Sequence, residues 1–227
     1  MPFTRFEHET SRSLDCSSVL VVGLGATEQH GPHLPLGTDT IVADALVDYL
    51  CEQDQRFVAG PTFPIGASGE HQGFLGTLSL GTDALAEVLV ELVRSARESC
   101  AGVYFVSGHG GNLDAVRSAL KRSQAEGDRV GVTFLSVDGG DAHAGHTETS
   151  LLLHLRPELV TYPWERGANE PVGVLLDSMR QGGVRAVSEN GVLGDPTGAT
   201  AQAGAQLFEQ MGGRLLAEAR TWLEEST

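Results

Sequence analysis

The sequence predicts an α/β protein with a mainly parallel sheet and helices on both faces. Three apolar segments support this prediction, at residues 18–22, 102–107 and 130–137, because each has the length and the unbroken hydrophobicity of a strand buried on both sides. A glycine-rich polar loop follows each of them, and a segment with helical periodicity follows each loop. Strands and helices that alternate in this way form parallel pairs, so the carboxyl ends of the strands meet at one edge of the sheet.

The helical segments differ in how clearly their ends are marked. The clearest spans residues 82–99, where leucine and valine recur on one face. Asp39 and Asn112 are residue types that cap helices, so we expect helices to begin there, the second ending at Gly127. Further helices are expected at 151–155 and from the loop 191–198 to about residue 225, and short extended pieces within 57–66 and at 76–80, whereas 160–183 is expected to be irregular, as a lid or a subunit contact.

Composition limits the class of protein. A chain of 227 residues, 41% of them apolar, suits one α/β domain, and no linker divides it, so residues 1–227 are expected to form a single domain. The formal net charge of -15 argues against a nucleic-acid groove, which needs clustered lysine and arginine. The three cysteines are far apart and form no CxxC pair, which argues against a disulfide framework and a thiolate zinc site.

Neither a membrane span nor a targeting segment is expected. No apolar run approaches the length needed to cross a bilayer. The N-terminal segment 1–15 is charged and lacks the apolar stretch of a signal peptide. The sequence therefore predicts a cytoplasmic protein.

The stretch GLGATEQHGPHLPLGTD, residues 23–39, directly follows the first predicted strand. Side chains two apart in an extended segment point to the same side, so Glu28 and His30 can converge on one point beyond the strand end. The simplest role of Asp39 is a helix cap. Its closeness to Glu28 and His30 makes it a candidate metal ligand as well.

Two more strand ends offer imidazole and carboxylate groups. His109 lies between glycines after the second long strand, and Glu148 follows the third. Taken singly, His109 could make a structural hydrogen bond and Glu148 could stabilise the first turn of a helix. Ligands of α/β proteins gather at the carboxyl ends of strands, which favours a shared site. The candidate metal ligands are Glu28, His30, Asp39, His109 and Glu148.

This set of ligand types indicates a catalytic metal centre. Mixed imidazole and carboxylate ligation suits Zn, Fe(II) or Mn. Ligands from separate loops leave coordination positions for water, as catalytic sites need. A centre with two metal ions requires a bridging carboxylate, for which Asp39 is a compact candidate.

Three other motifs fail on inspection. Gly23-Leu24-Gly25 follows a strand as in dinucleotide-binding proteins, but Glu28 stands where the third glycine belongs, and its charge would repel pyrophosphate. No GxxxxGK[ST] loop is present. The run Gly66-Ala67-Ser68-Gly69 is one residue too short for a GxSxG nucleophile elbow.

The motifs TEQHGPHLPLGTD, VSGHGGN and HAGHTETS, with GEHQGFLGTLSL and GVLGDPTGAT, together resemble the creatininase family of metal-dependent amidohydrolases. The resemblance covers nearly the whole chain, with the motifs in the family's order. It implies a three-layer α/β/α fold, a centre of two divalent metal ions and hydrolysis of C–N bonds. It also implies a homo-oligomer.

The resemblance implies two ligand sets that share Asp39 as the bridge. Creatininase itself takes one carboxylate two residues after the loop histidine, where this chain has Gly111, and Glu148 is then the implied replacement. The first set is Glu28, Asp39 and His109, and the second is His30, Asp39 and Glu148.

Further residues are assigned to proton transfer and to the substrate. His143 aligns with a family histidine that shuttles protons, and Glu148 is a second candidate for that role. His33 could orient His30 or the substrate, or be purely structural. Glu70 and His71 are placed at the rim of the pocket by the resemblance alone.

Within the family, the chain most resembles peptidases that release a modified C-terminal Val-Tyr dipeptide from a ribosomal precursor peptide, by means of a metal-activated water. Creatininase proper is a poorer match because its His-Tyr-Glu signature is absent. Two alternatives stay open, a hydrolase of a small cyclic amide or formamide and, in a different class, a non-catalytic metal-binding oligomeric scaffold. The open coordination of mixed ligands favours an enzyme.

Overall fold

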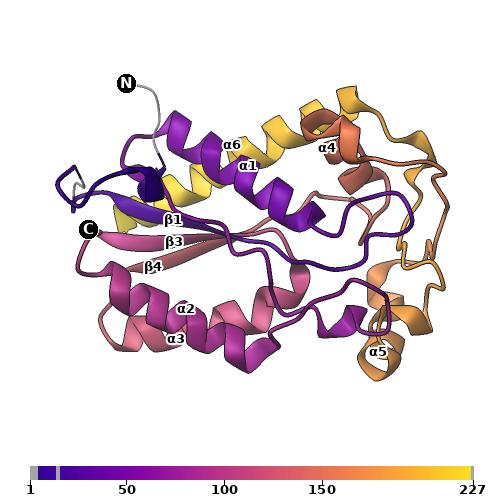
Figure 1. The fold of residues 1–227 in the computed structure, drawn as a ribbon, viewed down its shortest axis with the longest axis horizontal. Helices are drawn as coiled ribbons and strands as arrows, with labels where there is room; N and C mark the ends of the chain where they lie inside the picture. The colour runs from indigo at the N-terminus through magenta and orange to yellow at the C-terminus, as the bar shows by residue number, and fades with distance from the viewer. Residues whose placement is uncertain (1–4, 14–15, 226–227) are drawn as a thin grey trace.

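The computed structural model describes residues 5–13 and 16–225. Its centre is a four-stranded sheet in the order β2-β1-β3-β4, with every pair of neighbouring strands parallel (Figure 1). All six residues of β1 are buried, as the unbroken apolar run predicted. The strands are β1 (Val19–Leu24), β2 (Phe57–Ala59), β3 (Gly102–Ser107) and β4 (Val130–Phe134).

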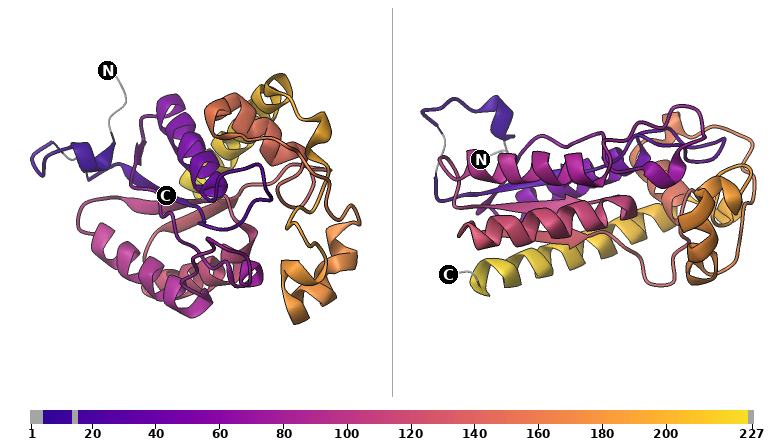
Figure 2. Two further views of the ribbon diagram at one scale, coloured as in Figure 1. Left: turned by 45° about the vertical axis from the view of Figure 1, so that its right-hand side comes forward. Right: turned by 90° about the horizontal axis from the view of Figure 1, so that it is seen from below.

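Helices cover both faces of the sheet, which confirms the three-layer α/β/α fold (Figures 1 and 2). Alternate residues of β1 face opposite cores: Val19 and Val21 pack under the first layer, and Leu20 and Val22 under the second. The first layer holds α1 (Thr38–Gln53), α4 (His146–Leu155) and α6 (Ala201–Glu225), and the second holds α2 (Thr82–Ala96) and α3 (Leu113–Ala125).

Neither predicted helix cap makes a capping hydrogen bond. Helix α1 begins at Thr38 after Gly37, so Asp39 lies inside its first turn. Asn112 ends a short 3-10 turn, and its side chain accepts a hydrogen bond from the Ala67 N–H (2.9 Å) and donates one to the Gly25 carbonyl (3.1 Å). Asn112 does occupy the N-cap position of α3, as predicted, whereas the prediction that Asp39 caps α1 was wrong because Gly37 holds that position. Both side chains serve contacts between distant loops, which local sequence does not show.

Several boundaries also differ from expectation. Helix α2 ends at Ala96 and β4 ends at Phe134, in each case three residues before the expected end. Helix α4 begins at His146, earlier than the expected residue 151. The piece expected at 76–80 is no strand, since only Leu78 forms an isolated bridge, with Thr27. Residues 1–4 and 14–15 of the N-terminal segment lie outside the described residues.

The segment 160–183 was wrongly expected to be irregular throughout. It contains α5 (Val172–Gly182), whose periodicity is obscured by Pro171 before it and by glycines at its beginning and end. Helix α5 lies beyond the sheet, next to the helical turn Gly69–His71 (Figure 1). It therefore lies at the edge of the sheet where the carboxyl ends of the strands lead into their loops.

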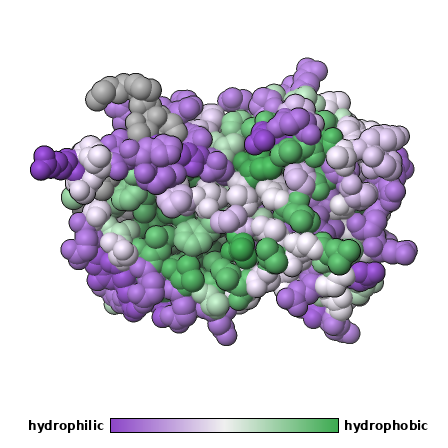
Figure 3. Space-filling model, in the orientation of Figure 1, coloured by the Kyte–Doolittle hydropathy of each residue, from purple (hydrophilic) through white to green (hydrophobic). Residues whose placement is uncertain are grey.

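Apolar surface is exposed between polar side chains on the face shown in Figure 3. Several exposed leucines belong to two neighbouring loops: Leu36, Leu75, Leu78 and Leu80, of which Leu75 is 97% exposed. Within the described part of the chain, we find no helix with both the length and the apolar character needed to cross a membrane.

Candidate metal centre

The strand ends and their loops converge on one cavity of about 420 Å³. Seven of the nine residues singled out in the sequence line it, from five separate segments of the chain. His30 lies behind this lining, in contact with two of its carboxylates, and His33 lies further back. The lining residues are Glu28, Asp39, Glu70, His71, His109, His143 and Glu148.

The first group of possible ligands is Glu28, Asp39 and His109. All three side chains are buried, and their nearest donor atoms lie within 4.8 Å of one another. His109 Nε2 is 3.2 Å from Glu28 Oε2, and His109 Nδ1 is 3.5 Å from Asp39 Oδ2. The structure thus brings together the residues that the resemblance implies as one ligand set.

A second group surrounds His30. Its Nε2 is 3.3 Å from Asp39 Oδ1 and 3.9 Å from Glu148 Oε2. His30, His143 and Glu148 also offer donor atoms within 4.8 Å of one another. Asp39 therefore faces a different group with each oxygen, which is the placement expected of a bridging carboxylate.

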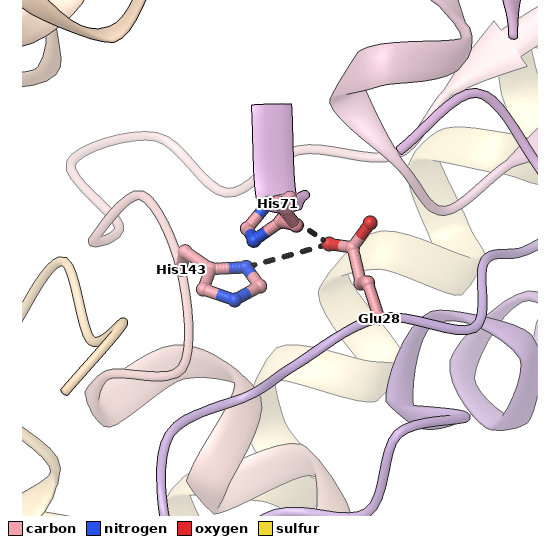
Figure 4. Close-up of side chains that lie close together, drawn as sticks. All are labelled: Glu28, His71 and His143. Atoms are coloured by element: carbon pink, nitrogen blue, oxygen red, sulfur yellow. Dashed lines mark ion pairs between the residues drawn. The ribbon is translucent and has the colours of Figure 1, made fainter. Parts of the chain in front are cut away.

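The third group links Glu28 with two histidines (Figure 4). His71 Nε2 is 3.2 Å and His143 Nδ1 is 3.8 Å from Glu28 Oε1. His71 is 4% exposed, so it lies inside the centre and not at its rim. The third group shares Glu28 with the first and His143 with the second, so the three groups form one continuous centre.

Buried atoms without partners show that these residues fit divalent cations. Within the described residues, both carboxylate oxygens of Glu28 and Oδ2 of Asp39 are buried and lack a hydrogen-bond partner. Buried carboxylate oxygens are expensive to leave unsatisfied, and a bound cation removes that penalty. The donor set of imidazole and carboxylate, without thiolate, matches Zn, Fe(II) or Mn.

The charge state of the groups agrees with this fit. Burial, reinforced by Asp39, raises the pKa of Glu28 well above its usual value, and burial raises the pKa of Glu148 to about 7. Burial alone would lower the pKa of His30, but Asp39, Glu148 and Glu28 raise it to about 10. Without cations the centre thus holds protons to limit its negative charge, and cations would replace them.

Gln29 is a contact residue of the centre that the sequence analysis did not identify. Its amide nitrogen lies 2.9 Å from His71 Nδ1 and 3.1 Å from the Gly191 carbonyl, so its two N–H groups have two acceptors. His143 Nε2 donates to the Gln29 backbone carbonyl at 2.7 Å. His143 is left with Nδ1 as its acceptor atom, turned toward Glu28.

No local signal marks Gln29. Because it alternates with Glu28 and His30, an extended segment would turn its side chain away from theirs. In the structure it reaches the same His71 ring that Glu28 contacts. Its partners His71 and His143 come from loops 42 and 114 residues away. Only the fold shows that these loops meet.

His33 connects the first loop to α4. Its Nε2 is 2.8 Å from the Thr149 hydroxyl, and burial together with His30 lowers its pKa to about 4. Among the two roles left open for His33, this contact favours the structural one. The contact joins the loop that carries Glu28 and His30 to α4.

A parallel α/β/α sandwich whose strand ends place buried imidazoles and carboxylates around an open cavity defines the class of α/β metallohydrolases. The family model described as creatinine amidohydrolase matches residues 5–218. The chain belongs to the creatininase family, and it is a hydrolase that acts on amide bonds.

Curated relatives are similar over most of the chain. The mycofactocin precursor peptide peptidase of Mycobacterium tuberculosis is 46% identical, with 95% of this chain and 90% of the relative covered. That of Mycolicibacterium smegmatis is 48% identical over 89% of this chain and 85% of the relative. A deformylase of a formylamino-pyrimidine nucleotide from Methanobrevibacter ruminantium is 27% identical over 58% of this chain and 56% of the relative.

Solved structures share the fold. A creatininase described as the Mn form superposes with a TM-score of 0.74, at 21% identity, over 90% of this chain and 91% of that chain. A mutant creatininase described as Zn-Zn type also gives a TM-score of 0.74, at 22% identity and 90% coverage of both chains. These similarities confirm the creatininase-like architecture.

Proposed function

We propose that this protein is the metal-dependent peptidase that releases the modified C-terminal Val-Tyr dipeptide from the mycofactocin precursor peptide. The observation that carries the proposal is a buried, unsatisfied carboxylate centre at the edge of a peptide-sized cavity. The chain's similarity to mycofactocin precursor peptide peptidases over 95% of its length supports the substrate.

In this proposal two divalent ions share the centre. Glu28, Asp39 and His109 hold one, and His30, Asp39 and Glu148 hold the other. Zinc, iron(II) and manganese suit these ligands, and manganese and zinc are named for the two solved creatininases. When bound, the ions supply positive charge that polarises an amide carbonyl and makes water a better nucleophile.

His143 moves the proton in this mechanism. Burial lowers its pKa well below the usual value, so the imidazole is neutral and can accept a proton. The hydrogen bond from Nε2 to the Gln29 carbonyl fixes the tautomer, so Nδ1 is the free acceptor atom. Nδ1 takes the proton from the attacking water and passes it to the leaving nitrogen of the amide. Glu148, whose Oε2 lies 3.9 Å from His30 Nε2, is the second candidate for that role.

His71 orients Glu28 and is not itself a ligand. The amide of Gln29 donates to His71 Nδ1, which leaves the proton of His71 on Nε2, 3.2 Å from Glu28 Oε1. At this geometry Glu28 Oε1 accepts no hydrogen bond, so the His71 N–H orients the carboxylate by electrostatic attraction and leaves Oε1 free to bind an ion. Glu70 lies 3.4 Å from His109 Nε2 and is 30% exposed at its side chain, so it faces both the centre and the substrate.

The proposal is tested by incubating metal-loaded protein with the precursor peptide that carries the modified C-terminal Val-Tyr and following the products by mass spectrometry. We expect one new dipeptide-derived product and the shortened precursor. The similarity to a deformylase motivates a formamide in the same substrate panel. Turnover of the formamide with an intact precursor would favour that alternative, and metal binding without turnover of any substrate would favour a scaffold.

We also propose a homo-oligomer. Leu75, Leu78 and Leu80 expose apolar side chains within six residues of one loop, and contiguous exposed apolar surface is typical of protein interfaces. Analytical ultracentrifugation of the protein and of Leu75→Glu tests this, since an interface there would weaken in the variant. The cytoplasmic location stays a prediction.

A further inference from the structure

Glu70 is a carboxylate of the cavity that neither proposed ligand set uses. Its side chain is 30% exposed and forms part of the cavity lining. Among the described residues it accepts no hydrogen bond, and its one ion pair is with His109, at 3.4 Å from Oε1 to Nε2. Glu148 and Asp141, by contrast, accept hydrogen bonds from backbone N–H groups. Glu70 therefore holds an unused carboxylate next to a proposed ligand.

Three oxygen atoms lie at nearly equal distances from Nε2 of His109. Glu28 Oε2 lies at 3.2 Å, Glu70 Oε1 at 3.4 Å and the Ser68 hydroxyl oxygen at 3.5 Å. Two ligand atoms that are each about 2.0–2.1 Å from a tetrahedral ion are about 3.3–3.4 Å from one another. The distance from His109 Nε2 to Glu70 Oε1 is therefore that of two ligands of one ion.

Gly111 makes room for the carboxylate of Glu70. A Cβ atom at position 111 would lie 2.4 Å from Glu70 Oε1 and 2.4 Å from His109 Nε2. It would also lie 2.5 Å from the Ala67 carbonyl oxygen, and real Cβ atoms do not approach other atoms this closely. A side chain at position 111 and the carboxylate of Glu70 thus exclude each other in these positions.

The backbone that carries Glu70 is fixed on two sides. The Ala67 N–H donates to the side chain of Asn112 (2.9 Å), which joins this loop to the loop of His109. On the other side Gly183 packs so closely that a Cβ atom there would lie 2.6 Å from the Glu70 carbonyl oxygen. A side chain on a fixed backbone is preorganised for its ligand.

We propose that Glu70 is a further metal ligand, which binds through Oε1 the same ion as His109. This inference rests on the two-ion centre of the proposed function and adds one carboxylate to it. Carboxylate oxygen suits the same divalent ions as the rest of the centre. The ion at His109 then has four protein ligands and the ion at His30 has three. The first ion is held more tightly, and the second keeps more positions free for water and substrate.

The test compares the binding of cobalt(II) to metal-free wild type and to metal-free Glu70→Ala. Cobalt(II) is the probe because its visible absorption depends on the number and arrangement of its ligands. The variant should bind the first, tighter cobalt ion at least about tenfold more weakly than the wild type. The visible absorption of that ion should also change, because it has lost a ligand.

Glu209→Ala is the matched control. Glu209 is exposed on α6 and lies outside the cavity lining, so this variant changes the net charge by the same amount. It should bind cobalt as the wild type does, and circular dichroism verifies that both variants fold. Unchanged cobalt affinity in Glu70→Ala, or an equal loss in both variants, would overturn the proposal. A loss of affinity with unchanged absorption would also overturn it, because Glu70 would then only position His109.

The outcome is separable from that of the proposed function. Loss of the tighter cobalt site in Glu70→Ala, without cleavage of the precursor by the wild type, would reject the peptidase assignment and keep Glu70 as a ligand. Cleavage by the wild type, with an unchanged cobalt site in Glu70→Ala, would do the opposite.

Discussion

Asp39 contacts His30 with one carboxylate oxygen and His109 with the other. The distances are 3.3 Å from Oδ1 to His30 Nε2 and 3.5 Å from Oδ2 to His109 Nδ1. The two histidines come from loops after β1 and β3, neighbouring strands of the sheet. Asp39, in the first turn of α1, thus contacts two groups of possible ligands. Each group needs its other residues as well as Asp39 to hold an ion.

Replacing Asp39 by alanine should remove metal from both halves of the centre. Each proposed ion loses one of its protein ligands, so we expect metal content near zero and no hydrolysis, with a folded chain. Elemental analysis after dialysis and far-UV circular dichroism check this. Asp83→Ala is the control because Thr82-Asp83 opens α2 as Thr38-Asp39 opens α1, but Asp83 is exposed. Normal metal content in Asp39→Ala would exclude the bridge.

His143→Ala should separate proton transfer from metal binding. If His143 acts through Nδ1 as an acid–base group, the variant keeps its metals and turnover falls about 10²–10⁴-fold. The measurement is kcat at saturating substrate together with metal content. His154→Ala, at an exposed position of α4, is the control. Loss of one metal in His143→Ala would instead make His143 a ligand, which its membership in two donor groups allows.

The strands and most of the site could be predicted because each depended on local signals. The apolar runs of β1 and β3 are long and bounded by glycine, and parallel strands must deliver their loops to one edge. Glu28, His30 and His109 therefore converge for a topological reason. The family model then confirmed what the ordered motifs implied.

What could not be predicted depends on contacts between distant loops. Gln29 binds groups from the loops of His71 and His143, and Asn112 ties together the backbones at Ala67 and Gly25, so neither role is written in neighbouring residues. Helix α5 was missed for a different reason. Its apolar face points at the cavity and its ends carry glycine and proline, so its pattern is that of a loop.

Removing metal should destabilise the fold. Both carboxylate oxygens of Glu28 and Oδ2 of Asp39 accept no hydrogen bond from the described residues, so a chelator leaves them unsatisfied. At metal concentrations about 1,000-fold above Kd, bound metal contributes about 4 kcal/mol to the free energy of unfolding. Thermal unfolding with and without chelator measures the effect. A chelator should barely change Tm in Asp39→Ala, and an equal shift in that variant and the wild type would contradict the assignment.

The buried carboxylate of Asp54, which two half-exposed arginines hold at the opposite end of α1 from Asp39, makes stability depend on pH. Asp54, at the end of α1, accepts hydrogen bonds from Arg56 (2.9 and 2.6 Å) and from Arg220 of α6 (2.8 Å). These hydrogen bonds, led by Arg56, hold the pKa of Asp54 below its usual value. A carboxyl group with a depressed pKa in the folded state stabilises the protein above its unfolded pKa of about 3.9, and this contribution is lost as pH falls through the folded value.

Asp54→Asn should therefore lower the free energy of unfolding by about 1 kcal/mol at pH 7, a small value because both arginines are about half exposed. The difference from the wild type should shrink steadily once the pH falls below about 4. Urea unfolding of the metal-free proteins at several pH values measures it, since metal loss at low pH would otherwise contribute. Asp177→Asn is the control, because Asp177 pairs with Arg180 at a fully solvated site. A difference that is constant across this pH range would show that Asp54 stabilises the junction of α1 and α6 by packing and not by charge.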